Sequence, residues 1–332
     1  MLASVLAWNA GPSIGPCLES LLAQSHPCHV LVIDNGSTDG TADYIAEHFP
    51  TVELIRLPHN TGFCGGHNHA IRAAEKRGHT HVWLVNDDAR VERTALARML
   101  QDMESDPAIG LCSPVIMNDG DQHDAVEFCG ARFDMDNFRK VKLPSLEAAR
   151  LAAAAGEINM LHGTAILARM DLITRIGGLD ERYFAYFDDD SLSMRSLQAG
   201  MKNHMSLDAI VWHDNPVAHE RSAYYHYLMT RNAWIFWSGQ TGLRGKWRLL
   251  RTLGAKALVD AASLLQKGRT AQSTALLRGL YDGLVKRYGP PPQNPSIGRM
   301  WFRVLMWHPY FLARVLAPAP RPASSHPPAM TA

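Results

Sequence analysis

The sequence predicts an α/β protein with a mostly parallel sheet flanked by helices, followed by a C-terminal helical region. In residues 1–95, short apolar runs rich in β-branched residues alternate with stretches in which apolar residues recur at helical spacing. The connections are short, as in parallel sheets whose strands are joined through helices. At 332 residues, with 46% hydrophobic and 20% charged residues, the chain can bury a large core.

The first half is expected to contain four strands separated by three helices. The fourth strand, from His81 to Val85, has the continuous apolar character of a buried central strand. The expected strands cover residues 4–8, 30–33, 52–56 and 81–85, and the expected helices cover residues 14–22, 41–49 and 67–76.

The second half has longer connections between its expected elements. Residues 117–143 are polar, and we expect them to be irregular. The expected strands cover residues 111–116, 160–169 and 209–213, and the expected helices cover residues 146–155 and 191–199.

The composition changes at Leu243. From Arg244 onward there are 14 Lys or Arg and two acids, Asp260 and Asp282, which leaves 19 basic and 30 acidic residues in the front of the chain. Basic amphipathic helices are expected over residues 243–265 and 271–287, an apolar segment with tryptophans over 297–316, and a disordered tail over 317–332. Such helices indicate an anionic membrane surface as partner; helices packed on the rest of the protein are the alternative.

Cysteine usage and hydropathy indicate the cellular compartment of the protein. Five scattered cysteines without a C-x-x-C pair favour reduced thiols over a disulfide framework or a zinc site. The N-terminus lacks the features of a signal peptide, and no apolar run approaches the ~20 residues that span a bilayer. We therefore expect a cytoplasmic protein, with peripheral attachment to the inner face of the plasma membrane left open, and no nucleic-acid partner.

Polar side chains follow three of the expected strands. Asn9 follows the first strand, Asp34 the second, and the adjacent Asp87 and Asp88 the fourth. The carboxyl ends of neighbouring parallel strands form the ligand-binding edge of an open α/β sheet. Two adjacent carboxylates repel each other unless a cation lies between them, and a divalent metal carrying a diphosphate would supply one. An acidic turn, Asx-turn or helix cap is the alternative interpretation.

A glycine-containing loop precedes the third expected helix. Gly62, Gly65 and Gly66 would let backbone amides approach a phosphate at a helix start. Plain turn chemistry explains them equally, and the loop matches neither the Walker motif nor the dinucleotide-binding motif.

Four segments carry a resemblance when they are taken in order. They are residues 4–9 (SVLAWN), 32–41 (VIDNGSTDGT), 60–63 (NTGF) with Gly66 and Asn68, and 84–88 (LVNDD). Together they resemble the nucleotide-sugar half of the family-two inverting glycosyltransferases with the GT-A fold, and within it the bacterial rhamnosyltransferase and galactofuranosyltransferase branch. The match spans roughly positions 1–240.

The resemblance implies roles for the polar residues of this half. Asp34 would hold the base of the nucleotide, Asp87 the ribose, and Asp88 the Mg²⁺ or Mn²⁺ ion that bridges the diphosphate. The same resemblance includes Asn9, Gly62 and Asn68 among the residues that bind the nucleotide-sugar donor.

Three consecutive carboxylates, Asp188 to Asp190, follow an aromatic cluster. Mutual repulsion and partial desolvation should raise the pKa of at least one of them toward the range useful for a general base. Acids are also favourable in the first turn of a helix, and both interpretations can hold. The segment resembles the acceptor motif of the family, which implies that Asp188 takes its Glu/Asp position and that Asp189 is the catalytic base, while Ser191 replaces a further Asp.

Two later residues complete the predicted site. His213 ends an expected strand where this branch often has a further metal ligand, although a single His is more often a satisfied core or surface residue. Arg231 lies in an aromatic segment followed by Arg-Asn that also resembles this branch. It could bind phosphate through both of its terminal nitrogens, and a salt bridge on a helix surface explains it equally.

The sequence therefore predicts a metal-dependent inverting glycosyltransferase. Its donor would be a dTDP- or UDP-sugar, with rhamnose as the first choice of sugar, and its acceptor a glycan or polyprenyl-linked glycan of a cell-surface polysaccharide. The expected parts are a nucleotide-sugar half (residues 1–95), an acceptor-binding and catalytic half (96–243), the basic helical region (244–316) and the tail (317–332). A catalytically silent glycan-binding scaffold and a sugar-nucleotidyltransferase are the alternatives.

Overall fold

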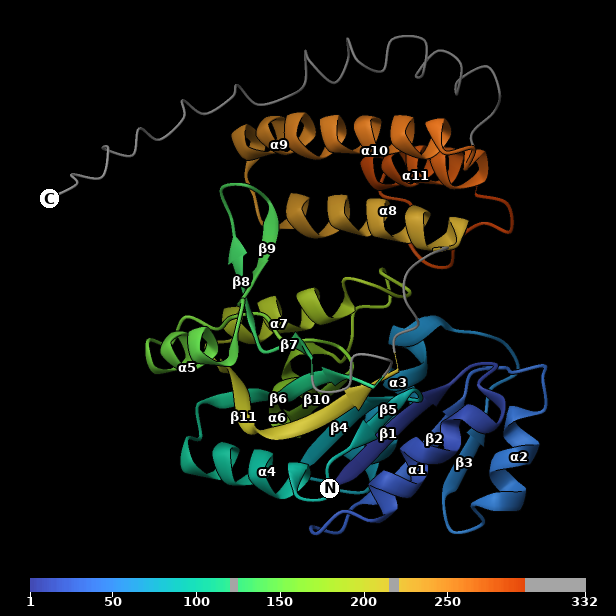
Figure 1. Cartoon of the computed structure of the whole chain (residues 1–332), viewed down its shortest axis with the longest axis vertical. Coiled ribbons are helices and arrows are strands. Elements are labelled where there is room, and N and C mark those ends of the chain that lie inside the picture. Colours follow the sequence, from blue (N-terminus) through green and yellow to red (C-terminus); the bar gives the residue numbers. More distant parts are fainter. Residues whose placement is uncertain (120–124, 215–220, 296–332) are drawn as a thin grey trace, which may run out of the picture.

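The computed structural model describes residues 1–119, 125–214 and 221–295. A sheet with helices packed around it makes up one part of the molecule (Figure 1). At the other end of the long axis lie four helices, α8 (Ala223–Gly239), α9 (Leu243–Leu249), α10 (Ala255–Gln266) and α11 (Thr270–Leu284). The expected apolar segment 297–316 and the tail 317–332 lie outside the described residues.

The first half forms the parallel part of the sheet, as expected. Its strands are β1 (Leu2–Ala7), β2 (His29–Asp34), β3 (Glu53–Arg56) and β4 (His81–Asn86), in the order β3-β2-β1-β4. The short helix η1 (Gly11–Ile14), α1 (Gly15–Leu22), α2 (Thr41–His48) and α3 (Gly62–Lys76) connect them. Ala7 pairs with Asp34, and Leu6 pairs with Asn86, so the carboxyl ends of β2 and β4 lie on either side of the end of β1.

The second half continues the same nine-stranded sheet with mixed directions. Its strands are β5 (Ala89–Val91), β6 (Ile109–Asn118), β7 (Val126–Phe128), β10 (Ala165–Arg169) and β11 (Lys202–His213). Strand β10 is antiparallel to both β4 and β6, whereas β11 is parallel to β6 and antiparallel to β5. The helices of this half are α4 (Ala95–Ser105), α5 (Leu146–Ala154), α6 (Met170–Ile176) and α7 (Asp188–Gln198).

A β-hairpin lies in the stretch that was expected to be irregular. Strands β8 (Ala131–Asp134) and β9 (Arg139–Lys142) pair antiparallel and project toward α8 and α9 (Figure 1). The Asp134 carboxylate accepts hydrogen bonds from the amide and the side chain of Asn137, which closes the turn. The aromatic rings of Phe133 and Phe138 pack on Trp237 of α8, with ring centroids 6.1 and 6.0 Å apart.

One hydrophobic core runs through the sheet domain and reaches Leu249 in α9. A smaller apolar cluster joins α10 to α11. Helix α11 in turn packs against α8. The helix expected over residues 243–265 is present as α9, a π-helical turn (Leu250–Gly254) and α10. Each helix in the described ranges is too short or too polar to cross a lipid bilayer.

Candidate functional site

The loops after β1 and β2 are joined through Asn9. Its backbone has a left-handed φ of 53°, its amide donates to Ser37 Oγ, and its Oδ1 accepts from the Thr38 amide, both at 2.9 Å. Asp34 is buried, and its Oδ1 accepts a hydrogen bond from the Ser37 amide at 3.3 Å. The turn chemistry considered as an alternative for these residues is therefore present, and it leaves Asp34 at the carboxyl edge of the sheet.

Asp88 lies beside His213, 125 positions later in the sequence. Strand β5 begins at Ala89, which pairs with His213 at the end of β11, so the pairing brings the two side chains together. His213 Nε2 is 3.4 Å from Asp88 Oδ1, and His213 Nδ1 is 2.9 Å from Glu127 Oε2. The His213 side chain is 9% exposed and the Asp88 side chain 42%, so the carboxylate is the group that faces outward.

The electrostatics of this corner favour a cation. Burial, together with the charge of Asp88, raises the pKa of Asp87 to about 7. Burial would lower the pKa of His213, but its hydrogen bonds to Asp88 and Glu127 outweigh burial and raise the pKa to about 9. A positive charge is therefore stabilised between the carboxylates at this edge.

The second half of the chain brings Asp189 to the same edge. Asn86 donates its amide to the Thr164 carbonyl at 2.9 Å, which fixes the loop before β10 against the end of β4. In that loop the Gly163 amide donates to Asp189 Oδ2 at 3.2 Å, and the His162 ring lies 6.2 Å from the His213 ring. Residues from β4, the loop before β10, β11 and α7 thus form one continuous group of contacts.

The three consecutive carboxylates form the first turn of helix α7, where acids are favourable, although the N-cap position is Phe187 and has no side-chain cap hydrogen bond. Burial and the charge of Asp189 raise the pKa of Asp188 and of Asp190. Burial would also raise the pKa of Asp189, but the charges of Lys140 and His162 and the amides of Asp190 and Gly163 lower it below its usual value. The expected upward shift therefore occurs at the two neighbours, and Asp189 is the carboxylate held in its ionised form.

The loop that leads into α7 has a strained backbone. Phe184, Tyr186 and Phe187 have φ values of 68°, 64° and 64°, in the left-handed region that bulky side chains rarely adopt. Asn232 of α8 donates to the carbonyls of Tyr183, Ala185 and Tyr186 at 3.0, 2.7 and 2.9 Å. These hydrogen bonds hold the loop in the conformation that presents Asp188 to Asp190.

Arg231 precedes Asn232 on α8 and also hydrogen-bonds to the loop ahead of α7. It is fully buried, and it donates to the carbonyls of Tyr183, Arg182 and Gly289 and to Asn232 Oδ1. Arg231 is buried and does not lie on the surface of the helix, so the surface salt bridge considered for it is not what the structure shows. Its structural role is to tie α8 to the loop ahead of α7, and its contact with the donor stays a prediction.

Gly62 and Asn68 also connect α3 to the loop between α6 and α7. A Cβ atom on Gly62 would lie 2.4 Å from the Phe184 carbonyl oxygen, so only glycine permits this approach. Asn68 accepts from the Leu179 amide at 2.8 Å and donates to its carbonyl at 2.9 Å and to Glu181 Oε1 at 2.8 Å. Both residues have a packing reason to be present, and their donor contacts likewise stay predictions.

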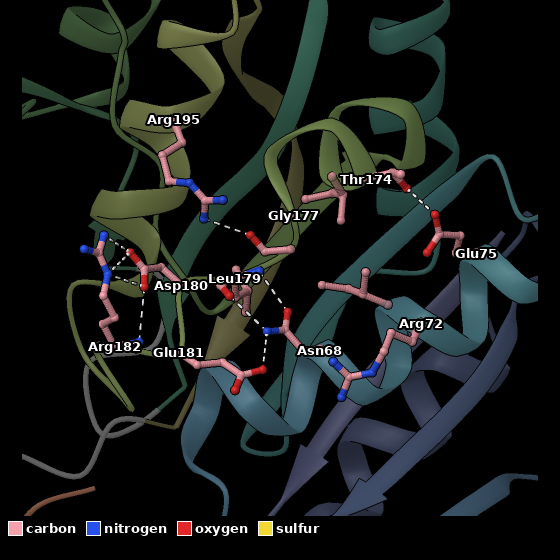
Figure 2. A pocket seen from close by; sticks show the side chains of 13 residues that line it. Asn68, Arg72, Glu75, Thr174, Gly177, Leu179, Asp180, Glu181, Arg182 and Arg195 are labelled. Carbon is pink, nitrogen blue, oxygen red and sulfur yellow. Dashed lines mark hydrogen bonds and ion pairs between the residues drawn. The ribbon is translucent and has the colours of Figure 1, made fainter. Parts of the chain in front are cut away.

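A cavity of about 550 Å³ lies between α3 and the loop that follows α6 (Figure 2). Asn68 is the predicted site residue that lines it; the aspartates at the strand ends and in α7 do not. The guanidinium of Arg182 hydrogen-bonds to both Asp180 oxygens, and that of Arg195 to the carbonyls of Gly178 and Ile176. These charged groups brace the loop beside the site.

Four residues of the site were not singled out by the sequence analysis. Lys140 reaches Asp190 from the hairpin, Glu127 orients His213, and His162 faces Asp189. The fourth is Trp8, whose side chain is 54% exposed and whose backbone hydrogen-bonds to Asp87. Of these four residues, only Trp8 has a local signal in the sequence, since it is an aromatic residue at the end of an expected strand. The other three lie far from their partners along the chain.

The donor set at Asp88 and His213 fits a divalent cation that also binds a diphosphate. In the described ranges no group of three or more His, Cys, Asp or Glu side chains is arranged to hold a metal. Mg²⁺ ions that bind substrate phosphates nevertheless have only one or two protein carboxylates as typical ligands, a role that Asp88 would fill. Glu127 on the other nitrogen of His213 is the outer-shell partner that metal-bound histidines have.

Comparison with known proteins identifies the family of the chain. The glycosyl transferase family 2 model matches residues 4–177, more than half of the chain and ending before the acid cluster of α7. N-acetylglucosaminyl-diphospho-decaprenol L-rhamnosyltransferase from Mycobacterium tuberculosis is 26% identical over 293 residues, which cover 80% of this chain and 94% of that protein. An uncharacterized glycosyltransferase, YibD from Escherichia coli, is 30% identical over 111 residues, or 32% of this chain and 31% of that protein.

Among solved structures, a mannosyltransferase from Pyrobaculum calidifontis in complex with GDP-Man and Mn²⁺ has a similar fold. The TM-score is 0.55 at 18% sequence identity, and the match covers 86% of this chain and 87% of that one. The fold class predicted from the sequence, a GT-A-type α/β domain with a C-terminal helical region, is confirmed. The chain belongs to glycosyltransferase family 2, in the branch that resembles rhamnosyltransferases.

Proposed function

We propose that the protein transfers a sugar, with inversion, from a nucleoside-diphosphate sugar to a hydroxyl of a glycan or polyprenyl-linked glycan. The first choice of donor is dTDP-rhamnose and the second a UDP-sugar. The rhamnosyltransferase relative, whose name gives a lipid-diphosphate-linked sugar as its acceptor, supports this choice. The observation that carries the proposal is the continuous group of contacts from Asp88 through His213 and His162 to the loop that binds Asp189.

The predicted site residues have separate tasks in this reaction. Asp34 and Asp87 bind the nucleoside, and Asp88 and His213 would hold Mg²⁺ or Mn²⁺. When bound, this ion neutralises charge on the leaving diphosphate. Asp189 accepts the proton of the acceptor hydroxyl while that oxygen bonds to the anomeric carbon, and the bond to the diphosphate oxygen breaks with its electrons on the diphosphate. One displacement inverts the anomeric centre.

Replacement of Asp189 by Asn tests the base assignment. The amide keeps the size of the side chain but accepts no proton, so transfer from dTDP-rhamnose to N-acetylglucosaminyl-diphospho-decaprenol should fall by about 10²- to 10⁴-fold. The donor should still raise the melting temperature of the variant in the presence of Mn²⁺, because the residues that bind it are unchanged. Asp88→Asn, in contrast, should lose the Mn²⁺-dependent part of that shift. Full turnover by Asp189→Asn would rule out this base.

The proposal includes a membrane surface as partner of the C-terminal helices. On α9, Leu243 is 83% exposed and Trp247 73% exposed, and they alternate with Arg244 and Lys246. Of the two acids after position 243, Asp282 is fully buried and Asp260 pairs with Lys256. Exposed apolar side chains next to basic ones match an anionic bilayer, where a polyprenyl-linked acceptor would reside.

A further inference from the structure

Three carboxylates in succession, two of them buried, need a positive charge nearby. Asp188 and Asp190 are buried, with Asp190 fully so, and Asp189 lies between them in the first turn of α7. Lys140 Nζ lies 2.8 Å from Asp190 Oδ2. Within the described ranges no second Lys or Arg forms an ion pair with these three acids. Lys140 is therefore the cation on which the cluster depends.

Lys140 reaches the cluster from an element that is remote in sequence. It lies on β9, 50 positions before Asp190, and its ammonium also lies 5.2 Å from the centroid of the Phe187 ring. Phe187 precedes the acids directly, so the ammonium touches both the strained loop and the helix that follows it. The lysine thus contacts the segment that fixes where Asp189 points.

The hairpin that carries Lys140 is itself held in place. Phe133 and Phe138, on either side of its turn, pack against Trp237 of α8. Arg248 of α9 lies 5.1 Å from the centroid of the Phe138 ring and 3.5 Å from Asp136. These contacts fix the position of the hairpin and therefore of the Lys140 backbone. The ammonium group is thus held close to the acids of α7.

The charged groups that face Asp189 come from three elements. Asp188 and Asp190 flank it on α7, Lys140 faces it from β9, and His162 faces it from the loop before β10. The two neighbouring acids oppose its negative charge, whereas Lys140 is the strongest attractive charge acting on it. Loss of Lys140 would leave mainly like charges around the carboxylate.

We propose that Lys140 is a positioning residue for Asp189, because its ion pair with Asp190 and its contact with the Phe187 ring hold the Asp188–Asp190 cluster in place. This inference rests on the proposed function, because Asp189 must be the base for its position to matter. It assigns a role in transfer to the β8–β9 hairpin, which lies outside the motifs that carry the family resemblance.

Kinetics of Lys140→Met and Lys140→Arg in the full chain test the proposal. With dTDP-rhamnose and N-acetylglucosaminyl-diphospho-decaprenol, Lys140→Met should lower kcat about tenfold or more, with the donor KM changed less than about twofold. The acidic limb of its pH–rate profile should move up by about one pH unit, because a carboxylate without its cation binds protons more tightly. Lys140→Arg should restore much of kcat and the position of that limb.

The control is Arg139→Gln on the same strand. The Arg139 side chain is 63% exposed and pairs with Asp134 inside the hairpin, so its loss removes one positive charge without touching α7. It should leave kcat and the pH–rate profile unchanged. If Lys140→Met has the same kinetics as Arg139→Gln, the proposed role of Lys140 is wrong. The assignment of Asp189 as base would still stand if Asp189→Asn loses transfer. No transfer by the wild-type chain with dTDP-, UDP- or GDP-sugars would overturn the function and the inference together.

Melting temperatures provide a second measurement that needs no substrate. Without Lys140 the folded cluster binds protons more tightly than the unfolded chain does, so the stability of Lys140→Met should fall as pH rises. Its deficit in melting temperature should be larger at pH 8 than at pH 5.5. If the single variant does not fold at pH 8, Lys140→Met/Asp190→Asn, which removes both partners, should recover. A deficit that is independent of pH would contradict the proposal.

Discussion

At the scale of single residues, His67 is a buried imidazole that must stay neutral. It is fully buried, its Nδ1 is 2.9 Å from Ser4 Oγ, and burial lowers its pKa to about 3. In the unfolded chain a histidine titrates near ~6.5. Folding therefore excludes a proton that the unfolded chain binds, so stability is complete above this value and is lost as pH falls from it toward 3.

We therefore expect His67→Gln to weaken the acid sensitivity of the fold. At pH 5 the wild-type chain should have lost about 2 kcal/mol of unfolding free energy through His67, a loss that the variant should not show. Urea unfolding at pH 7 and pH 5 measures the difference. His26→Gln, at an exposed position, is the control and should behave as the wild type. An equal loss in His67→Gln and the wild type would show that His67 does not set this sensitivity.

The residues with local signals could be predicted from the sequence, and those without could not. Asp34, Asp87 and Asp88 follow strongly apolar strands, and parallel pairing brings such ends to one edge. Lys140 and Glu127 lie in a polar stretch without periodicity, and their partners are 50 and 86 positions away. Their roles depend on strand pairing in three dimensions, which the local sequence does not encode.

At the scale of elements, helix α8 acts as a clamp on the loop before α7. Asn232→Ala should leave three carbonyls of a strained loop without their shared donor and should lower the unfolding free energy by about 1–3 kcal/mol. Transfer should fall with it, because the loop presents Asp189. Ser238→Ala removes a bond from Ser238 Oγ to the Ile235 carbonyl within the same helix and should cost about 0.5 kcal/mol or less. Equal costs for the two variants in chemical denaturation would argue against the clamp.

The predictability of the elements follows the strength of their patterns. Strands β1 to β4 and helices α1 and α2 have clear apolar periodicity and were predicted with small shifts at their ends. The prediction was wrong for the start of α3, which begins at Gly62 rather than residue 67, so Gly65 and Gly66 lie inside a helix and not in a loop. Strands β5, β7, β8 and β9 are only three or four residues long, too short to show a clear apolar pattern. The sequence of β9 is Arg-Lys-Val-Lys, so most of its side chains are charged and the alternation of a strand is not visible. The strand expected over residues 160–169 is shorter, Ala165–Arg169, because the residues before it form the loop that binds Asp189.

At the scale of the whole molecule, the basic helices should bring the enzyme to anionic bilayers. The full chain should sediment with phosphatidylcholine/phosphatidylglycerol vesicles and much less with pure phosphatidylcholine, and high salt should release it. Leu243→Ser/Trp247→Ser should weaken binding by more than about tenfold, since each side chain would lose roughly 1.5–3 kcal/mol of burial. Leu151→Ser on α5, a site 69% exposed on the sheet domain, should have no effect. Binding by the double variant at the wild-type level would remove α9 as the contact.

The packing of the β8–β9 hairpin on α9 affects how shortened versions of this enzyme would behave. A polypeptide ending at Gly242 would lack Arg248, so the Phe138 ring would lose the guanidinium beside it and Asp136 would lose its ion-pair partner. The same two strands deliver the ammonium that neutralises the acids of α7. Deletion of the residues after Gly242 would therefore cause two defects, weaker binding to lipid and a less firmly held Asp189. Point replacements on the exposed side of α9 would affect lipid binding alone.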